Sequence, residues 1–311
     1  MSPAVSVLMP VRNEEAYLAQ ALRSLLSQSF EEFEIVLVDD GSTDSTPDQI
    51  QAFAQRDARI RAYRNPSSLG VTSSLNRALG LAEGAVIARL DGDDIARPDR
   101  IARQLGVLES HPDVGLVGIG VALIDAAGAF MRAFPGGLAP HAFRWTALAH
   151  APIVHSTAMF RTGLARAVGG YDPNYPVAQD FDLWCRLLHK AEGICLPGVG
   201  VRHRVHVRSV SATRLDEQLR SIVDIALRHA TTACLREARV EDSNYRAFLN
   251  ALHGRNRPET ARAQTRAMLD RMVAAFCQSH SLGPSETREI DAIAGQWLDA
   301  ATCAPSEAAG A

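Results

Sequence analysis

Three carboxylates surround a glycine in this sequence, at Asp91, Asp93 and Asp94. Two carboxylates separated by one residue can both reach a single hard divalent cation, which prefers oxygen ligands. A solvated turn would contain the same residues. A carboxylate about 5 Å from a phosphate charge repels it by roughly 3 kcal/mol at an effective dielectric constant of about 20, whereas a bridging Mg²⁺ or Mn²⁺ reverses the sign. The cluster therefore predicts a site for a divalent metal ion that carries a diphosphate.

A second pair of carboxylates, Asp39 and Asp40, ends the apolar run that begins at Phe33. Carboxylates at a strand end can accept hydrogen bonds from the N–H group of a nucleobase or from ribose hydroxyls. The stretch Asp40-Gly41-Ser42 could equally cap the helix that follows. These two interpretations remain open from the chemistry of the residues alone.

The segment VAQDFDLW contains Asp180 and Asp182 at the start of an apolar, helix-like stretch. Acidic residues are favoured in the first turn of a helix by the helix dipole, and this explanation is sufficient in most proteins. The functional alternative makes one of the two aspartates a general base, which must lie within hydrogen-bonding distance of a substrate hydroxyl.

The stretch VGVRHRVHVRSVS has strand-like alternation and predicts two different faces. One face would carry Val199, Val201, Val205 and Val207, and the other would carry Arg202, Arg204, His206 and Arg208. A cationic row of this kind suits phosphate oxygens or, through His206, a metal ion. A solvated face is favoured for Arg202 and Arg208, and a packing or surface position for the further histidines His150, His155 and His203.

The elements that must position these residues alternate regularly through the first hundred residues. Periodicity predicts strands at 4–10, 33–40, 59–65 and 84–91, with helices at 15–27, 44–56 and 71–82. Such alternation is typical of a mostly parallel sheet, in which ligands bind beyond the carboxyl ends of the strands. The clusters Pro10-Val11-Arg12, Asp39-Asp40 and Asp91-Gly92-Asp93 should therefore open onto one crevice.

The pattern changes towards the end of the chain. A helix at 99–109, strands at 115–125, 129–134, 156–161 and within 193–211, and a helix at 177–191 are predicted first. Beyond residue 212 the sequence has helical periodicity and few strand formers. We therefore predict an α/β domain at residues 1–212 and a helical C-terminal region at residues 213–311.

Composition excludes several classes of protein. A net charge of −3 over 311 residues argues against a generic nucleic-acid binder. Five cysteines without a C-x-x-C pair favour free thiols in a reducing compartment. Neither a signal peptide nor a membrane-length apolar stretch is recognisable, which predicts a cytoplasmic protein and leaves peripheral contact with the inner face of the plasma membrane open. Neither G-x-G-x-x-G after the first strand nor G-x-x-x-x-G-K-[ST] is present.

Residues 4–212 resemble the family-2 glycosyltransferases of the GT-A fold, in which a Rossmann-like, mostly parallel sheet is flanked by helices. The segments that carry the resemblance are SVLMPVRNEEAYLAQALRSLLSQSFEEFEIVLVDDGSTDST, SSLGVTSSLNRALGLAEGAVIARLDGDDIARPDRI, STAMFR, GGYDPNYPVAQDFDLWCRL and VHVRSVS. The first two segments are the most specific, and the helical C-terminal region lies outside the resemblance.

The resemblance implies a role for each cluster. The nucleotide-sugar donor would be bound by Pro10, Arg12, Glu14, Asp39, Asp40, Asp91, Gly92 and Asp93, with Asp40 accepting the N–H of the base. Asp91 and Asp93 would form a D-x-D motif that holds Mg²⁺ or Mn²⁺, assisted by His206. Asp180 would be the catalytic base. It would take the proton of the acceptor hydroxyl during an attack that inverts the anomeric carbon.

Two departures from the family pattern refine this expectation. Gln179 stands where many members have glutamate, while Asp180 is retained. The Q-x-x-R-W motif of processive members is absent, which favours transfer of a single sugar. The expected donor is a UDP- or dTDP-sugar, and the expected acceptor is a glycan or lipid-linked glycan of a bacterial surface polysaccharide. It would be bound by loops at 135–153 and 172–177.

Two alternatives are weighed against this reading. A sugar-phosphate nucleotidyltransferase normally has a glycine-rich, basic loop after the first strand, where this chain has PVRNEEAY. A non-catalytic nucleotide-sugar-binding scaffold would have no need of Asp180. For the C-terminal helices, packing against the first domain is the first expectation, followed by a homodimer contact and then by binding of acceptor or membrane.

Overall fold

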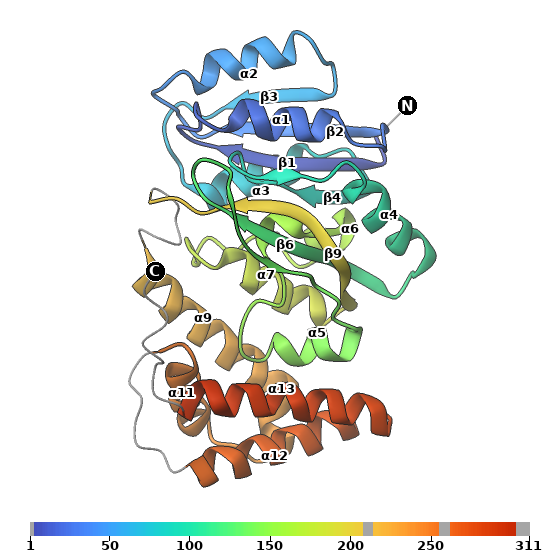
Figure 1. Ribbon diagram of the computed structural model, residues 1–311, viewed down its shortest axis with the longest axis vertical. Coiled ribbons are helices and arrows are strands. Elements are labelled where there is room, and N and C mark those ends of the chain that lie inside the picture. Colours follow the sequence, from blue (N-terminus) through green and yellow to red (C-terminus); the bar gives the residue numbers. More distant parts are fainter. Residues whose placement is uncertain (1–2, 208–213, 255–261, 303–311) are drawn as a thin grey trace. The chain divides into compact units, whose positions relative to one another are not determined.

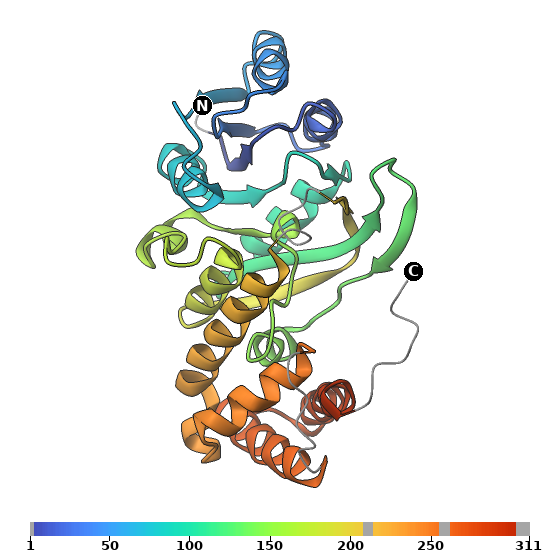
Figure 2. The ribbon, with the colours of Figure 1, turned by 90° about the vertical axis from the view of Figure 1, so that its left-hand side faces the viewer.

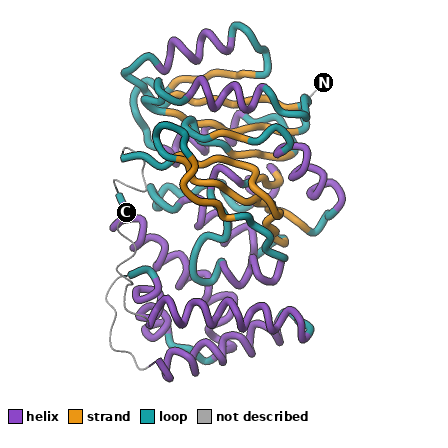
Figure 3. Tube along the Cα trace, in the orientation of Figure 1, coloured by secondary structure: helices purple, strands orange, loops and turns teal. Residues whose placement is uncertain are grey.

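The computed structural model describes residues 3–207, 214–254 and 262–302. Two compact units are present, and each is described by itself. Unit 1 comprises residues 1–140 and 151–215, and unit 2 comprises residues 141–150 and 216–311. Strands are found in unit 1, whereas unit 2 is helical where it is described (Figures 1 and 3). The predicted boundary at residue 212 falls outside the described residues.

One mixed sheet forms the centre of unit 1. Among the described residues it has nine strands, in the order β3-β2-β1-β4-β8-β6-β9-β5, with β7 paired to β6. The pairs β1–β2, β2–β3, β1–β4 and β6–β9 are parallel, and the other four are antiparallel. The strands are β1 (Val5–Val11), β2 (Phe33–Asp39), β3 (Ile60–Arg64), β4 (Val86–Arg89), β5 (Ile95–Ala96), β6 (Val114–Ile124), β7 (Phe130–Phe134), β8 (Met159–Arg161) and β9 (Glu192–Arg204).

Helices lie on both faces of this sheet. Figure 2 shows α1 (Leu18–Leu26) and α3 (Val71–Leu81) on opposite faces. The other helices of unit 1 are α2 (Thr46–Ala54), α4 (Arg100–Ser110), α6 (Thr162–Ala167) and α7 (Gln179–Leu188), with a short 3₁₀ turn at His155–Thr157. Every residue of β1 and β2 is buried, as expected for strands covered on both faces. The predicted α/β sheet flanked by helices is confirmed.

Short elements depart from the prediction. The two-residue strand β5 and the six-residue helix α6 were not predicted, because neither is long enough to show a hydrophobic period. The strand expected within 193–211 ends at Arg204. The alternation of the first hundred residues predicts a mostly parallel sheet. Antiparallel pairs are more frequent than that in the second half of the sheet, where β8 is antiparallel to both β4 and β6.

Unit 2 has a hydrophobic core of its own. Its helices are α5 (Pro140–Thr146), α9 (Leu215–Ala230), a π-helical turn at Thr231–Leu235, α10 (Arg236–Ala238), α11 (Asp242–Leu252), α12 (Arg262–Ser279) and α13 (Pro284–Thr302). The ring of Trp145 stacks on Trp297 with centroids 5.3 Å apart and meets Phe276 edge-on at 5.1 Å. In the described part of the chain, no helix combines the length and apolar character needed to cross a membrane.

This core corrects one expectation about the acceptor. The predicted acceptor loop at 135–153 contains α5, whose residues Phe143 and Trp145 are fully buried. Apolar side chains committed to a core cannot contact an acceptor. The middle of the segment 135–153 is therefore a packed helix rather than a surface loop that could bind an acceptor.

Candidate active site

The turn after β4 presents the first acidic cluster, and Gly92 is needed for its packing. A Cβ atom on Gly92 would lie 2.7 Å from Cγ1 of Val11 and 3.2 Å from Cγ of Glu14. Both residues belong to the end of β1 and the loop that follows it. The absence of a side chain at position 92 lets the acidic turn lie directly against the tip of β1.

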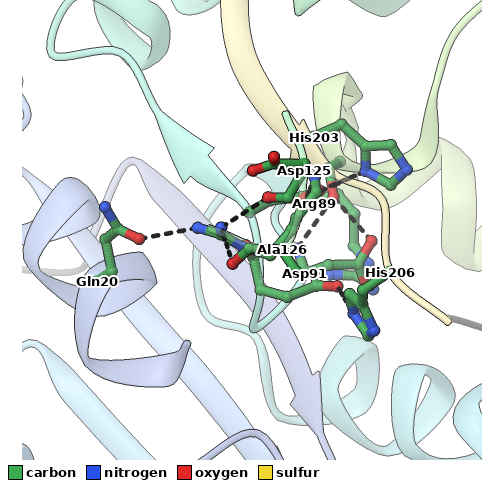
Figure 4. Close-up of polar contacts among 11 residues, drawn as sticks. Gln20, Arg89, Asp91, Asp125, Ala126, His203 and His206 are labelled. Carbon is green, nitrogen blue, oxygen red and sulfur yellow. Dashed lines mark hydrogen bonds and ion pairs between the residues drawn. The ribbon is translucent and has the colours of Figure 1, made fainter. Parts of the chain in front are cut away.

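Asp91 is held by partners on both carboxylate oxygens. Oδ1 pairs with the guanidinium of the buried residue Arg89, and Oδ2 accepts a hydrogen bond of 2.7 Å from Oγ of Ser156. Burial alone would raise the pKa of this carboxyl group, but the charge of Arg89 and the bond from Ser156 outweigh it, so the pKa is lowered. Asp91 is therefore a fixed anion at the end of β4 (Figure 4).

The negative charge of Asp93 is balanced less well by its neighbours than that of Asp91. Its Oδ2 lies 3.0 Å from Nε2 of His206, whose ring lies 5.4 Å from that of Tyr17. Burial and the neighbouring charges of Asp94 and Asp91 raise the pKa of Asp93 to about 6. A carboxylate made unstable by neighbouring anions would gain from a nearby cation.

The donor set fits a divalent ion that is shared with a ligand. Among the described residues, no three His, Cys, Asp or Glu side chains are grouped so as to hold a metal ion by themselves. Mg²⁺ is usually bound by one or two carboxylates together with substrate phosphates and water. Asp93 and His206 could supply two protein ligands, and Asp91, already paired with Arg89, is the less available of the two D-x-D carboxylates.

Asp94 has a structural role, and His203 is one of its partners. Its buried carboxylate accepts a bond of 2.8 Å from the backbone N–H of Arg204 and lies 3.0 Å from Nδ1 of His203. Burial would lower the pKa of His203, but the bond and the charge of Asp94 raise it to about 9. His203 is thus a partner of Asp94, with its side chain 26% exposed.

The predicted cationic row is wrong for Arg204. Its side chain is buried and donates to oxygens of the protein, so it does not face phosphate oxygens. Arg204 is instead surrounded by acceptor oxygens of the turn after β4, the β6–β7 turn and α1. Arg202 is exposed, as favoured from the sequence, and Arg208 lies outside the described residues.

Asp180 lies in the first turn of α7. The preceding residue but one, Ala178, has a left-handed backbone with φ of 57°, which is uncommon for a residue with a side chain and strains the entrance to the helix. Burial, together with the charge of Asp91, raises the pKa of Asp180 to about 6. The two carboxylates are therefore electrostatic neighbours, although they are 89 residues apart in the chain.

Asp182, the other aspartate of α7, differs from Asp180 because its carboxylate is used in a structural ion pair. Asp182 is fully buried and pairs with Arg186 at 2.6 Å, and Arg186 also donates to the backbone oxygens of Val168 and Gly170. Asp182 thus ties α7 to the loop after α6. The choice of Asp180 as the candidate base is consistent with this division of roles.

Asp40 is already saturated with hydrogen bonds. It accepts five, between 2.6 and 3.0 Å, from Asn65, Ser68, Leu69, Gly70 and Ser74. Burial would raise the pKa of Asp40, but these bonds lower it to about 2. The predicted cap of the helix that follows Asp40 is not found, because Asp40 binds the loop before α3 and the Ser74 side chain within α3 instead. Contact with a nucleobase would require Asp40 to exchange one of these partners.

The remaining predicted base-binding residues lie near the same strand ends. Asp39 accepts a bond of 2.9 Å from the backbone of Ser42, and its Oδ2 forms an ion pair with Arg64 at 3.2 Å. Pro10 is buried in β1, and Arg12 is exposed just beyond it. The backbone N–H of Asp40 donates to the carbonyl of Val11, and a Cβ atom at Gly92 would meet the side chain of the same valine. The tip of β1 thus lies between the two acidic turns.

Sequence reasoning missed the partners that set these charges. Arg89, Ser156 and Tyr17 were not predicted as site residues, and neither was the contact of 2.9 Å between His155 and Tyr171. An arginine inside an otherwise apolar strand, as at Arg89, is a signal that could have been used, because a buried arginine requires a partner.

Comparison with known proteins agrees with this geometry. Residues 6–169, more than half of the chain, match the family described as Glycosyl transferase family 2. The chain is 34% identical over 192 residues to EpsE of Bacillus subtilis (strain 168), provisionally named a glycosyltransferase, covering 60% of this chain and 68% of EpsE. It is 25% identical over 216 residues to the O-antigen biosynthesis glycosyltransferase WbnJ of Escherichia coli, covering 68% and 83%.

Solved structures support the fold. TarS 1–349 of S. aureus in complex with UDP superposes with a TM-score of 0.60 at 19% identity, covering 96% of this chain and 89% of that one. The mannosyltransferase PcManGT of Pyrobaculum calidifontis, in complex with GDP-Man and Mn²⁺, gives a TM-score of 0.58 at 20% identity, covering 97% and 86%. At these identities the likeness shows a shared GT-A fold.

Proposed function

Because the chain belongs to glycosyl transferase family 2, and is therefore a glycosyltransferase, we propose that it is an inverting, metal-dependent enzyme that transfers a single sugar. The donor would be a nucleoside-diphosphate sugar, with UDP or dTDP as the first choice. The acceptor would be a glycan or lipid-linked glycan in the synthesis of a bacterial surface polysaccharide. A lipid-linked acceptor would bring the enzyme to the inner face of the plasma membrane.

One observation carries this proposal. The half-buried Asp180, whose pKa is raised by burial to about 6, lies under the electrostatic influence of Asp91, and Asp91 shares its turn with Asp93, whose pKa is also raised. A general base and an anion-rich turn that favours a cation are the two groups that displacement at a sugar diphosphate requires. The Mn²⁺ and nucleotide complexes of the two structural neighbours are in line with it.

The donor end of the site would be organised by the turn after β4. Asp93 and His206 would hold Mg²⁺ or Mn²⁺, and Asp91 would accept a hydrogen bond from the donor or share the ion. The ion, when bound, would neutralise the charge that develops on the departing diphosphate. Pro10, Arg12, Glu14, Asp39, Asp40 and Gly92 are the proposed surroundings of the nucleoside, with Asp40 contributing after exchange of one of its present bonds.

Asp180 would remove the proton of the acceptor hydroxyl. As that proton moves to a carboxylate oxygen, the acceptor oxygen forms a bond to the anomeric carbon from the side opposite the diphosphate. The bond between that carbon and the diphosphate oxygen breaks, and its electron pair leaves with the nucleoside diphosphate. The configuration is inverted because the attack and the departure take place on opposite faces of the sugar.

A donor screen tests the proposal directly. The purified chain is incubated with UDP-, dTDP- and GDP-sugars, with Mn²⁺ or with EDTA, and both thermal stabilisation and release of nucleoside diphosphate are measured. Metal-dependent stabilisation and slow hydrolysis of at least one sugar are expected, since a ligand specific to the native state raises the melting temperature. Binding without any release of sugar would identify a scaffold. In a parallel incubation with nucleoside triphosphate and sugar phosphate, consumption of the triphosphate would identify a nucleotidyltransferase. Dimerisation through the C-terminal helices stays a prediction, which light scattering would test.

A further inference from the structure

Arg204 is a buried cation at the end of β9 that contacts three other segments of unit 1. Its side chain donates from Nε to the carbonyl of Asp93 at 3.0 Å, from Nη1 to the carbonyls of Asp125 and Ala126 at 3.1 and 3.0 Å, and from Nη2 to Oε1 of Gln20 at 2.8 Å. Figure 4 labels Gln20, Asp125 and Ala126, three of the residues that accept these bonds. The guanidinium therefore joins α1, the acidic turn, the β6–β7 turn and the end of β9.

The Arg204 side chain also contacts, through Tyr17, one of the residues proposed to hold the metal. Its Cζ lies 4.5 Å above the ring of Tyr17, and that ring contacts His206. The backbone N–H of Arg204 donates to Asp94, next to Asp93. Both proposed metal ligands are thus placed through Arg204: Asp93 through its own carbonyl, and His206 through Tyr17.

We infer that Arg204 is a positioning residue for the diphosphate end of the donor site, which acts on Asp93 and His206 without touching donor or metal. The inference rests on the proposed function. Its physical reason is the planar fork of the guanidinium, whose donors point in fixed directions and can hold several acceptors at once. A lysine would keep the charge, but its single ammonium group cannot reach carbonyls that approach from different sides.

The test compares Arg204→Lys with matched changes. The probe is Mn²⁺ together with whichever of UDP, dTDP and GDP stabilises the wild type most, and calorimetry measures the dissociation constant of the folded protein. Arg204→Lys is expected to weaken binding about tenfold and to raise the KM for donor more than it lowers kcat. The exposed neighbour Arg202, changed to lysine, is the control and should leave the affinity unchanged.

Two substitutions of Gln20 test a single hydrogen bond of the guanidinium, the one from Nη2 of Arg204 to Gln20. Gln20 is exposed, so Gln20→Ala should fold normally, lose one acceptor of Arg204 and weaken binding two- to threefold. Gln20→Glu keeps an acceptor oxygen at that place and should bind as the wild type does. A purely structural role would lower the melting temperature of these variants without changing the affinity of the folded protein.

The outcomes separate this inference from the proposed function. If the wild type binds no nucleoside diphosphate with Mn²⁺, the proposed function fails. If the wild type binds and folded Arg204→Lys binds equally well, only the positioning role is overturned. Should Arg204→Lys not fold, Gln20→Ala decides: a two- to threefold loss restored in Gln20→Glu supports the role, and an unchanged affinity overturns it.

Discussion

The turns that follow β2 and β4 flank the same strand, β1, and each carries adjacent carboxylates, but their electrostatics are opposite. Asp40 accepts five hydrogen bonds, and its pKa is lowered to about 2. Asp93 is paired with His206 and surrounded by other anions, and its pKa is raised to about 6. Two aspartates that look alike in the sequence therefore differ in whether the protein itself satisfies their charge.

This difference teaches what each turn contributes. A carboxylate with enough donors stabilises the fold, because its charge is better accommodated in the native state than in water. A carboxylate held among like charges does not stabilise the folded state by itself, and binding of a cation would relieve the repulsion between these charges. The pKa of Asp180 is also raised to about 6, but chiefly by burial, with a smaller contribution from the charge of Asp91. The same substitution, aspartate to asparagine, should therefore have three different consequences.

The largest effect is expected at Asp180. Asp180→Asn keeps the shape of the side chain but removes the proposed base, so kcat for transfer should fall about 10³-fold, within the range for general bases. Binding of the nucleoside diphosphate with Mn²⁺ should stay within about twofold of the wild type. Steady-state kinetics and calorimetry on one preparation measure both. Undiminished turnover would remove Asp180 from the mechanism.

At Asp93 the expected loss is in metal-dependent binding. Asp93→Asn should weaken the affinity for nucleoside diphosphate with Mn²⁺ about 100-fold and have little effect with EDTA present. The free energy of unfolding of the ligand-free protein should not fall, because the substitution removes a partly buried charge that lies close to the charges of Asp91 and Asp94. Asp99→Asn, half exposed at the start of α4, serves as the control. An equal affinity in Asp93→Asn and wild type would refute the metal assignment.

Asp40→Asn should act on stability instead. A pKa lowered from 3.8 to about 2 corresponds to roughly 2 kcal/mol of stabilisation at neutral pH. The folded-state pKa lies below the unfolded value, so this contribution is present above about pH 4 and is lost as the pH falls towards 2. Urea unfolding at pH 7 measures it, with the exposed Asp48→Asn expected within about 0.5 kcal/mol of wild type. If the two variants unfold alike, Asp40 is not the anchor of the loop before α3.

The smallest expected effect is the pH dependence of the wild type. Asp180 must be ionised to act as a base, and its pKa is raised to about 6. The value of kcat/KM, which reports the ligand-free enzyme, should therefore fall at least tenfold per pH unit below 6 and level off above it. The fall should be steeper than for a single group, because Asp93 protonates in the same range. A kcat/KM that is flat between pH 5 and 8 would contradict the proposed base.

Much of unit 1 could be predicted from local sequence patterns. The apolar runs ending at Val11 and Asp39 are strands because they are β-rich and of strand length, and the acidic residues fall at their carboxyl ends. Helices α1, α3, α4 and α7 follow from apolar residues at helical spacing. The proximity of Asp91 and Asp180 followed from the family resemblance, since nothing in the spacing of residues 89 apart requires it.

The charges of the site were decided by tertiary structure alone. Asp40 finds its donors at residues 65–74, Asp91 meets Ser156, and Arg204 turns inward to Gln20, 184 residues earlier in the chain. The sequence by itself determined which residues are acidic and at which strand ends they stand, because local periodicity acts over a few residues. Whether each charge is compensated depends on neighbours that only the folded chain brings within hydrogen-bonding distance.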